Sequence, residues 1–340
     1  MAKVLVAGGA GFVGSNLVRA LLERGDEVLV VDNLLSSERE NVPEGATLVE
    51  ASINDDDVLA SLPEDLDLAF NLVTYHGNQS SMADPLADHE HNLLTSLKLF
   101  QRLSQIKRLR KVVYAGAGCT VAEKTFEAAS ATQEDAPVSL YLDSPYQISK
   151  VVGELYGNYF WMREGLPIVK ARFQNVYGPG EVLGAGRWRG TIHTVWRNVT
   201  PTFVWKALHD EALPLDNGGI ATRDFIYVED MARGLIACAE KGEPGGVYNL
   251  ASGVETSIRE LAETIVELCG SGRVEIAPPR DWDRSGRRFG ATEKSERELG
   301  FKAEVGLREG LERQIAWTRE NEAFIAACIA KHADRMAAAA

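Results

Sequence analysis

Residues 3–14 read KVLVAGGAGFVG, an apolar run that leads directly into a glycine-rich turn. Glycine allows the backbone of such a turn to bend tightly and to approach a ligand closely. The pattern that follows predicts a helix over residues 12–24, and the free N–H groups at the start of a helix favour a pyrophosphate. The stretch therefore predicts a strand, a turn and a helix of the kind that bind a dinucleotide.

Valine-rich runs recur along the first half of the chain, with helical patterns between them. The runs lie at residues 3–8, 27–32, 46–51, 66–73, 111–116 and 167–173. This alternation predicts a parallel sheet with helices on both faces, which is a Rossmann-type doubly wound α/β fold. After residue 178 the pattern loosens, and we expect a smaller α/β substrate-binding lobe there.

A carboxylate ends the second apolar run. Asp32 lies 18 residues after Gly14, where it can accept hydrogen bonds from both hydroxyls of a ribose and would repel a 2′-phosphate. This position favours NAD over NADP. The predicted cofactor-binding residues are Gly8, Gly11, Phe12, Val13, Gly14, Asp32, Asn33, Ser52, Ile53, Tyr146 and Lys150.

The two lobes are expected to interleave along the chain. We predict an NAD-binding Rossmann domain in residues 1–178, with return segments near residues 218–252 that contain the strand-like runs RDFIYV and GGVYNLAS. Residues 179–217 and 253–335 are expected to form the substrate-binding lobe, and residues 336–340 a disordered tail.

The composition is that of a soluble globular protein, with 45% hydrophobic and 25% charged residues in 340. A formal charge of −13 argues against nucleic acid or an anionic membrane as a partner. The four cysteines are far apart and form no CxxC pair, and the histidines near residues 76–91 lack ligand spacing, so we expect neither disulfides nor a metal. The chain starts without an export signal, and a cytoplasmic location is expected.

A candidate catalytic pair lies in SPYQISK, residues 144–150. Tyr146 and Lys150 are four residues apart, which places them on the same face of a helix. An ammonium group near a tyrosine favours the phenolate and lowers a pKa that is about 10 in water. The pair therefore predicts a tyrosine that acts as a base near neutral pH.

Several motifs together resemble the extended short-chain dehydrogenases/reductases of the NAD-dependent epimerase/dehydratase family. They are GGAGFVG, VDNLLSS, SPYQISK, RFQNVYGPG, ATRDFIYVEDMARG and SERELGF, and they span nearly the whole chain. The resemblance implies that NAD accepts a hydride from a nucleotide-activated sugar while the tyrosine removes a hydroxyl proton. The keto sugar is then reduced again, epimerised, dehydrated or decarboxylated. The family also implies a homodimer, through helices at about residues 86–108 and 145–163.

The resemblance assigns the substrate-binding residues as well. Asn175 matches an asparagine near the sugar, Asn198 one near the diphosphate, and Arg223 an arginine that pairs with phosphate, because a guanidinium can bond two phosphate oxygens at once. The remaining predicted substrate-binding residues are Ser81 and His76 in the loop after the fourth strand, Arg187 in a cation-rich segment, and Arg280, which matches a second phosphate-binding arginine.

The segment VVYAGAGCTV, residues 112–121, departs from the family pattern. The family generally has a serine or threonine here that hydrogen-bonds to the reacting sugar oxygen, whereas this chain has Gly118 or Ala117, depending on the alignment. Thr120 and Cys119 are the nearest catalytic groups that could compensate, with a bound water as a third. A related GDP-mannose 3,5-epimerase uses a cysteine in this turn as acid/base, while the Thr-Asp-Glu of 4,6-dehydratases is absent.

Two further positions differ from the pattern. Gln174 replaces a common aromatic residue or asparagine and adds a polar group near the nicotinamide, and Ser52 replaces an aspartate that meets the adenine.

The activity expected from all these observations is epimerisation of a nucleotide-diphosphate sugar through a transient 4-keto intermediate. A 4-dehydrogenase or a decarboxylase of a nucleotide uronate is the alternative, and a non-catalytic NAD-binding sensor or scaffold is the alternative of another class.

Overall fold

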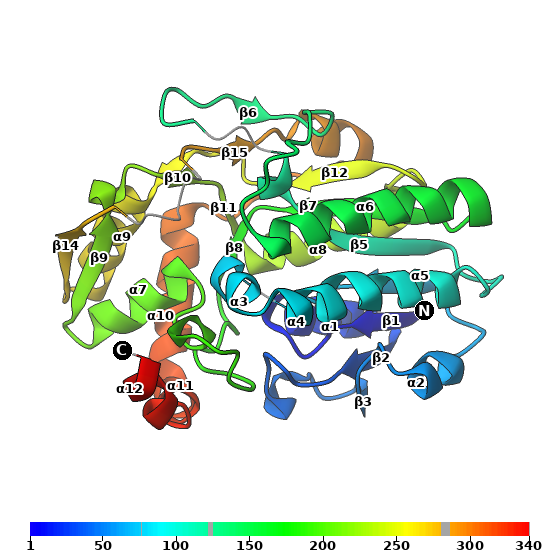
Figure 1. Cartoon of the computed structure of the whole chain (residues 1–340), viewed down its shortest axis with the longest axis horizontal. Coiled ribbons are helices and arrows are strands. Elements are labelled where there is room, and N and C mark those ends of the chain that lie inside the picture. Colours follow the sequence, from blue (N-terminus) through cyan, green and yellow to red (C-terminus); the bar gives the residue numbers. More distant parts are fainter. Residues whose placement is uncertain (76, 122–124, 280–285, 340) are drawn as a thin grey trace.

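A seven-stranded parallel sheet forms the centre of the larger lobe in the computed structural model, which describes residues 1–75, 77–121, 125–279 and 286–339 (Figure 1). The strand order is β12-β7-β5-β4-β1-β2-β3. Successive strands are added on one side of β1 as far as β3 and then on its other side from β4 onward, as in doubly wound folds. The predicted Rossmann-type fold is therefore confirmed. The strands are β1 (Lys3–Ala7), β2 (Glu27–Asp32), β3 (Thr47–Glu50), β4 (Leu68–Asn71), β5 (Lys111–Ala117), β7 (Ile168–Phe173) and β12 (Val247–Leu250).

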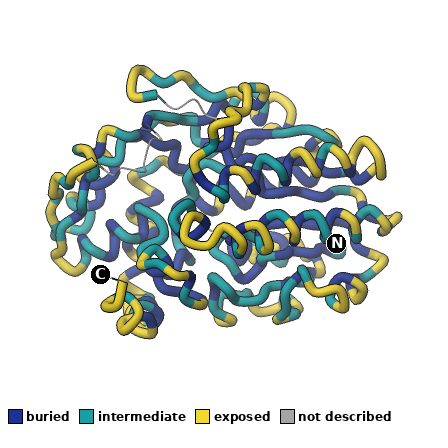
Figure 2. Tube along the Cα trace, in the orientation of Figure 1, coloured by how far each residue is buried: buried dark blue, intermediate teal, exposed yellow. Residues whose placement is uncertain are grey.

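Both faces of this sheet are covered by helices, and its central strands are buried, whereas the edge strand β3 is partly exposed (Figures 1 and 2). In β1, Val4 and Val6 face a core shared with α1 (Phe12–Glu23) and α8 (Val228–Lys241), while Leu5 and Ala7 face α5 (Thr95–Leu103) and α6 (Pro145–Glu164). Successive side chains of a strand point to opposite faces, so a strand that is buried on both sides needs apolar residues at every position. This requirement accounts for the continuous valine-rich runs in the sequence.

The smaller lobe has its own core, on the left of Figure 1. Its parallel strands β9 (Ala212–Asp216) and β14 (Arg273–Ala277) pack with α7 (Val199–Leu208), α9 (Ile258–Cys269) and α10 (Leu307–Glu320) around apolar residues such as Phe203 and Leu213. Besides β9 with β14, three short strand pairs of the described residues lie outside the seven-stranded sheet. They are β8 (Asn175–Tyr177) with β11 (Phe225–Tyr227), β10 (Thr222–Arg223) with β13 (Thr256–Ser257), and β6 (Ala131–Thr132) with β15 (Phe289–Gly290).

Helical segments make up most of the remaining ordered elements. They are α2 (Asp56–Ser61), α3 (Asn78–Ala83), α4 (Pro85–Asp88), the π-helix η2 (His89–Leu94), η6 (Ser295–Leu299), α11 (Glu322–Ala330), α12 (Ala333–Ala339) and the 3-10 turns η1 (Arg39–Asn41), η3 (Gly118–Thr120), η4 (Ile192–Thr194) and η5 (Asn217–Gly219). The alanine tail, expected to be disordered, continues α12 through Ala339, because alanine has the highest helix propensity.

Neither a membrane-spanning helix nor a metal-binding cluster is found among the described residues. No helix in this part of the chain is both long and apolar enough to cross a membrane. The described residues form no group of three or more histidine, cysteine or acidic side chains that could hold a metal.

Candidate active site

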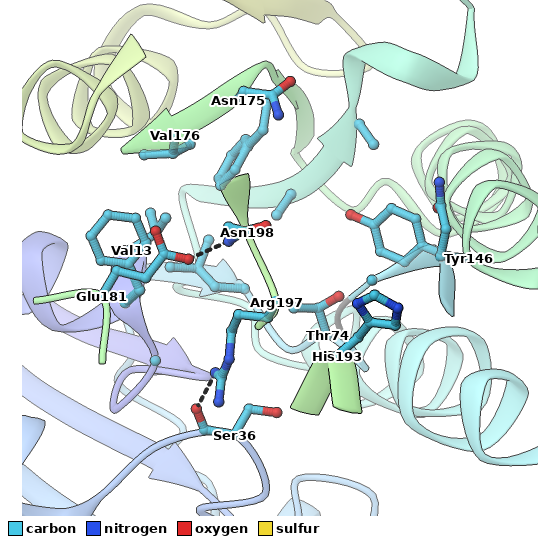
Figure 3. A pocket seen from close by; sticks show the side chains of 18 of the residues that line it. Val13, Ser36, Thr74, Tyr146, Asn175, Val176, Glu181, His193, Arg197 and Asn198 are labelled. Carbon is cyan, nitrogen blue, oxygen red and sulfur yellow. Dashed lines mark hydrogen bonds between the residues drawn. The ribbon is translucent and has the colours of Figure 1, made fainter. Parts of the chain in front are cut away.

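One cavity of ≈ 660 Å³ brings together residues of both lobes at the carboxyl ends of the central strands (Figure 3). In doubly wound folds this edge of the sheet is where ligands bind. All of the predicted cofactor-binding residues line the cavity: Gly8, Gly11, Phe12, Val13, Gly14, Asp32, Asn33, Ser52, Ile53, Tyr146 and Lys150.

Two positions of the glycine-rich turn, Gly8 and Gly14, leave no room for a side chain. Gly8 has a φ of +81°, and a Cβ there would lie 2.9 Å from the backbone of Leu72. A Cβ on Gly14 would lie 2.2 Å from the carbonyl oxygen of Gly8. Helix α1 begins after Gly11 without a side-chain cap or an acidic residue in its first turn, so its first N–H groups and its positive dipole end suit the pyrophosphate of a dinucleotide.

Asp32 closes this turn from the end of β2. Its carboxylate accepts hydrogen bonds from the backbone N–H groups of Ala10 (3.0 Å) and Leu34 (2.8 Å) and from the hydroxyl of Ser37 (3.3 Å). Burial raises the pKa of Asp32, and these hydrogen bonds act against burial because they stabilise the charged form. The carboxylate therefore shapes the loop as well as facing the cavity.

Tyr146 and Lys150 lie on the first turns of α6. Ser144 caps this helix by accepting a hydrogen bond from the N–H of Gln147 at 3.3 Å, and Pro145 occupies the first helical position. Lys150 is buried. Its Nζ donates to the Ala115 carbonyl at 2.9 Å and lies 5.9 Å from the centroid of the Tyr146 ring.

The pKa values of this pair differ from those that the sequence predicts. Burial lowers the pKa of Lys150 to about 8. Burial also raises the pKa of Tyr146, and a hydrogen bond involving Thr74 acts in the opposite direction. The expectation of a lowered tyrosine pKa is therefore wrong for this cavity, because desolvation of the phenol is the largest influence on its pKa and the Lys150 ammonium donates to the carbonyl of Ala115 instead.

A buried carboxylate, Asp88, lies next to the segment that carries the pair, and no motif in the sequence pointed to it. Asp88 accepts hydrogen bonds from the amide of Asn92 (2.7 Å) and the hydroxyl of Ser149 (2.5 Å), and so connects η2 to α6. Its negative charge raises the pKa of Lys150 against the effect of burial. The amide of Asn92 in turn accepts a hydrogen bond from the N–H of Tyr75 at 2.7 Å.

Cys119 and Thr120, the two candidates to replace the missing hydroxyl, differ in their position relative to the cavity. Cys119 lines the cavity. Thr120 does not, because its buried hydroxyl donates to the carbonyl of Ala117 within the same turn, at 2.7 Å. The prediction that Thr120 supplies a catalytic hydroxyl is not supported by this arrangement.

The predicted substrate-binding residues fall into three groups. Asn175, Asn198 and Arg223 line the cavity. Ser81 and Arg187 do not line it: Ser81 accepts a hydrogen bond from the N–H of Tyr146 at 3.2 Å, and Arg187 donates to the carbonyl of Asn33 at 2.9 Å. His76 and Arg280 lie outside the described residues.

Three further residues line the cavity. Thr74 follows β4, His193 belongs to η4, and Glu181 follows β8. In Figure 3, Thr74 and His193 lie on the same side of the cavity as Tyr146. Glu181 accepts a hydrogen bond from the amide of Asn198. No sequence signal pointed to these residues, since they come from three separate segments and belong to no motif.

Comparisons with known proteins agree with this geometry. Residues 4–251 match the NAD dependent epimerase/dehydratase family. The chain is 56% identical to the Bordetella bronchiseptica enzyme WbmF, solved in complex with NAD+ and UDP, with a TM-score of 0.90 over 99% of this chain and 98% of that one. It is 29% identical to a Thermotoga maritima UDP-glucose 4-epimerase solved with UDP-glucose, with a TM-score of 0.84 over 94% and 99% of the two chains.

A curated relative extends the same likeness. The UDP-glucose 4-epimerase of Mycolicibacterium smegmatis is 31% identical over 324 residues, which are 93% of this chain and 98% of that protein. The chain thus belongs to the NAD-dependent epimerase/dehydratase family of extended short-chain dehydrogenases/reductases, and its cofactor is NAD.

Proposed function

We propose that this protein is an NAD-dependent epimerase that inverts the configuration of one sugar carbon of a UDP-sugar through a transient 4-keto intermediate. The observation that carries the proposal is that Tyr146 and Lys150 share one cavity with the glycine-rich turn on one side and with Asn175, Asn198 and Arg223 on the other. The similarity to UDP-glucose 4-epimerases and to an enzyme solved with UDP supports uridine diphosphate as the nucleotide.

In this proposal, Tyr146 exchanges the proton of the sugar hydroxyl in both directions. Bound NAD supplies the site that accepts the hydride and later returns it. Because burial raises the pKa of Tyr146, the phenol keeps its proton at neutral pH. It is then suited to protonate the keto oxygen, while the oxidation step, which needs the phenolate, becomes faster as the pH rises. Lys150, with a pKa of about 8, is mostly charged at neutral pH and stabilises the phenolate as it forms.

The test is a panel of UDP-, dTDP-, GDP- and CDP-sugars incubated with the protein and followed by proton NMR. An epimerase converts one sugar of the panel to its epimer and leaves no NADH at the end of the reaction. Net accumulation of NADH would instead identify a 4-dehydrogenase, and release of carbon dioxide a uronate decarboxylase. A Tyr146→Phe variant is the control and should lose conversion. If no sugar is converted or raises the thermal midpoint, the non-catalytic sensor is the better explanation.

The position of Cys119 favours a second candidate reaction. Its side chain belongs to the cavity that contains Tyr146, and a thiol can exchange a proton at a carbon next to a keto group. Epimerisation at such a carbon takes up deuterium from heavy water, whereas return of the hydride to carbon 4 does not. Deuterium uptake that is lost in Cys119→Ala, but kept in the control Cys269→Ala outside the cavity lining, would support this second reaction.

We also propose that the protein is a cytoplasmic homodimer that pairs through α6. Ile148, Leu155, Tyr159 and Met162 are exposed apolar residues at helical spacing along this helix, and apolar residues at this spacing form one face. Sedimentation should show a dimer at micromolar concentration, and Leu155→Lys with Met162→Lys should give a monomer. A wild-type protein that sediments as a monomer would contradict the proposal.

A further inference from the structure

The carboxamide of Gln174 occupies the space that a side chain at position 118 would need. A Cβ on Gly118 would lie 2.2 Å from Nε2 and 2.7 Å from Cδ of Gln174. A Cβ on Gly290 would lie 2.8 Å from the same Nε2. Neither glycine has a positive φ, so the backbone conformation does not require glycine at these two positions. Both glycines instead allow the carboxamide to lie between them.

The sheet register brings Gln174 to this place. Ala117 at the end of β5 pairs with Phe173 at the end of β7, so Gly118 and Gln174 are the next residues of two neighbouring strands. Gln174 lines the same cavity as Tyr146 and Lys150. Its carboxamide makes no hydrogen bond to any other residue in the described part of the chain. Its two N–H donors are therefore available to a ligand.

The wall behind Gln174 is held by a buried carboxylate. Asp224 accepts hydrogen bonds from the N–H of Gly290 (3.2 Å), from the N–H (2.8 Å) and hydroxyl (2.7 Å) of Ser252, and from the N–H of Gly253 (3.0 Å). Such a network limits the movement of Gly290, which in turn limits the positions that the carboxamide can take. A donor that is held in place before the substrate arrives stabilises developing charge with little reorganisation.

We propose that Gln174 is a catalytic residue whose carboxamide N–H donates a hydrogen bond to the reacting oxygen of the substrate, in place of the hydroxyl absent from position 118. The inference rests on the proposed function. During oxidation the sugar C–H bond breaks and its hydride goes to NAD, the hydroxyl proton goes to Tyr146, and a C=O bond forms. The carboxamide neither gains nor loses a proton, and it stabilises the negative charge on the oxygen.

The first test compares Gln174→Met with the wild type. Methionine keeps the length of the side chain and removes the donor. We expect kcat and kcat/KM for the accepted UDP-sugar to fall together by on the order of 100-fold, as when one donor to a developing oxyanion is removed. Unchanged kcat in a correctly folded variant would overturn the inference.

The second test exchanges the donor between the two positions. Gly118→Ser alone places its Cβ 2.2 Å from Nε2 of Gln174, so the carboxamide must move away, and we expect activity to fall. In a Gln174→Ala background the serine has room for its side chain. The kcat of the Gly118→Ser/Gln174→Ala double variant should be at least tenfold higher than that of Gln174→Ala alone. Gly118→Ala in the same background is the matched control, because it fills the same space without a hydroxyl. Equal activity of the serine and alanine variants would contradict the proposed role.

A binding measurement separates this inference from the proposed function. If the wild type converts a sugar and Gln174→Met converts it equally well, the inference fails and the function stands. If the wild type converts no sugar, calorimetry with UDP and UDP-glucose decides. If the wild type binds UDP-glucose more tightly than UDP and Gln174→Met does not, the contact between Gln174 and the sugar is supported, and only the proposed epimerisation is rejected. If both proteins prefer UDP-glucose to the same extent, or if the wild type has no preference, the contact between Gln174 and the sugar is rejected.

Discussion

Glu181 gives the sharpest prediction about stability. Its side chain is only 4% exposed, and it accepts a hydrogen bond from the amide of Asn198. Within the described residues its second carboxylate oxygen has no hydrogen-bond partner. Burial raises the pKa of Glu181 from 4.5 to about 7, against the opposing effects of Asn198 and of the positive charge of Arg197. The folded protein therefore binds this proton more tightly than the unfolded chain does.

The sign and size of the effect on stability follow from this shift. Well below pH 4.5, Glu181 is protonated in both the folded and the unfolded state, and its raised pKa does not change the free energy of unfolding. As the pH rises, the unfolded chain loses this proton first, and the loss of stability reaches its full value above about pH 7. At about 1.4 kcal/mol per pH unit, ionised Glu181 lowers the free energy of unfolding by roughly 3 kcal/mol. Glu181→Gln keeps the shape and the acceptor for Asn198 but removes the charge. Arg197 keeps its hydrogen bonds to the carbonyls of Ser36, Ala185 and Thr194.

Urea unfolding of the ligand-free protein at several pH values tests the prediction. Glu181→Gln should be more stable than the wild type by about 1 kcal/mol at pH 5 and about 3 kcal/mol at pH 8. Glu44→Gln, at an exposed glutamate, is the control and should follow the wild type. A difference between Glu181→Gln and the wild type that stays constant with pH, or a wild type that is the more stable protein at pH 8, would refute the reasoning.

Three other substitutions test the site and its support. Gly14→Ala places a Cβ 2.2 Å from the Gly8 carbonyl oxygen, and calorimetry should show a loss of NAD binding, with a loss of about 1–3 kcal/mol in unfolding free energy. Asp88→Asn removes the charge that raises the pKa of Lys150, so a pH–rate profile should show Lys150 losing its proton at a lower pH than the value of about 8 in the wild type. Asp224→Ala leaves buried donors without an acceptor, and chemical denaturation should show a loss of about 3 kcal/mol or more.

The cofactor half of the site could be predicted because its signals are local. The glycines of residues 8–14 and the carboxylate of Asp32 belong to one strand, turn, helix and strand, and the need for glycine comes from the backbone of that unit. The start of α6 was equally predictable, since Ser144 and Pro145 are typical of a helix N-terminus. Each of these features depends on residues close in sequence.

The substrate half could not be predicted in the same way. The side chains of Ser81, Arg187 and Thr120 have the chemistry that was expected of them, but each has a partner within the protein. Which acceptor a hydroxyl or a guanidinium meets depends on the packing of distant segments. For the same reason, no local pattern pointed to Thr74 and His193, which reach one cavity from different lobes.

The sequence by itself determined the doubly wound sheet, the position of the dinucleotide turn and the helix that carries Tyr146 and Lys150, because periodicity, glycine and helix-capping residues act over short distances. It also showed that a hydroxyl is absent at position 118. Only the tertiary structure decided what stands there instead. The parallel pairing of β5 with β7 places Gln174 beside Gly118, and a contact between residues 56 positions apart in the chain arises only once the strands have paired.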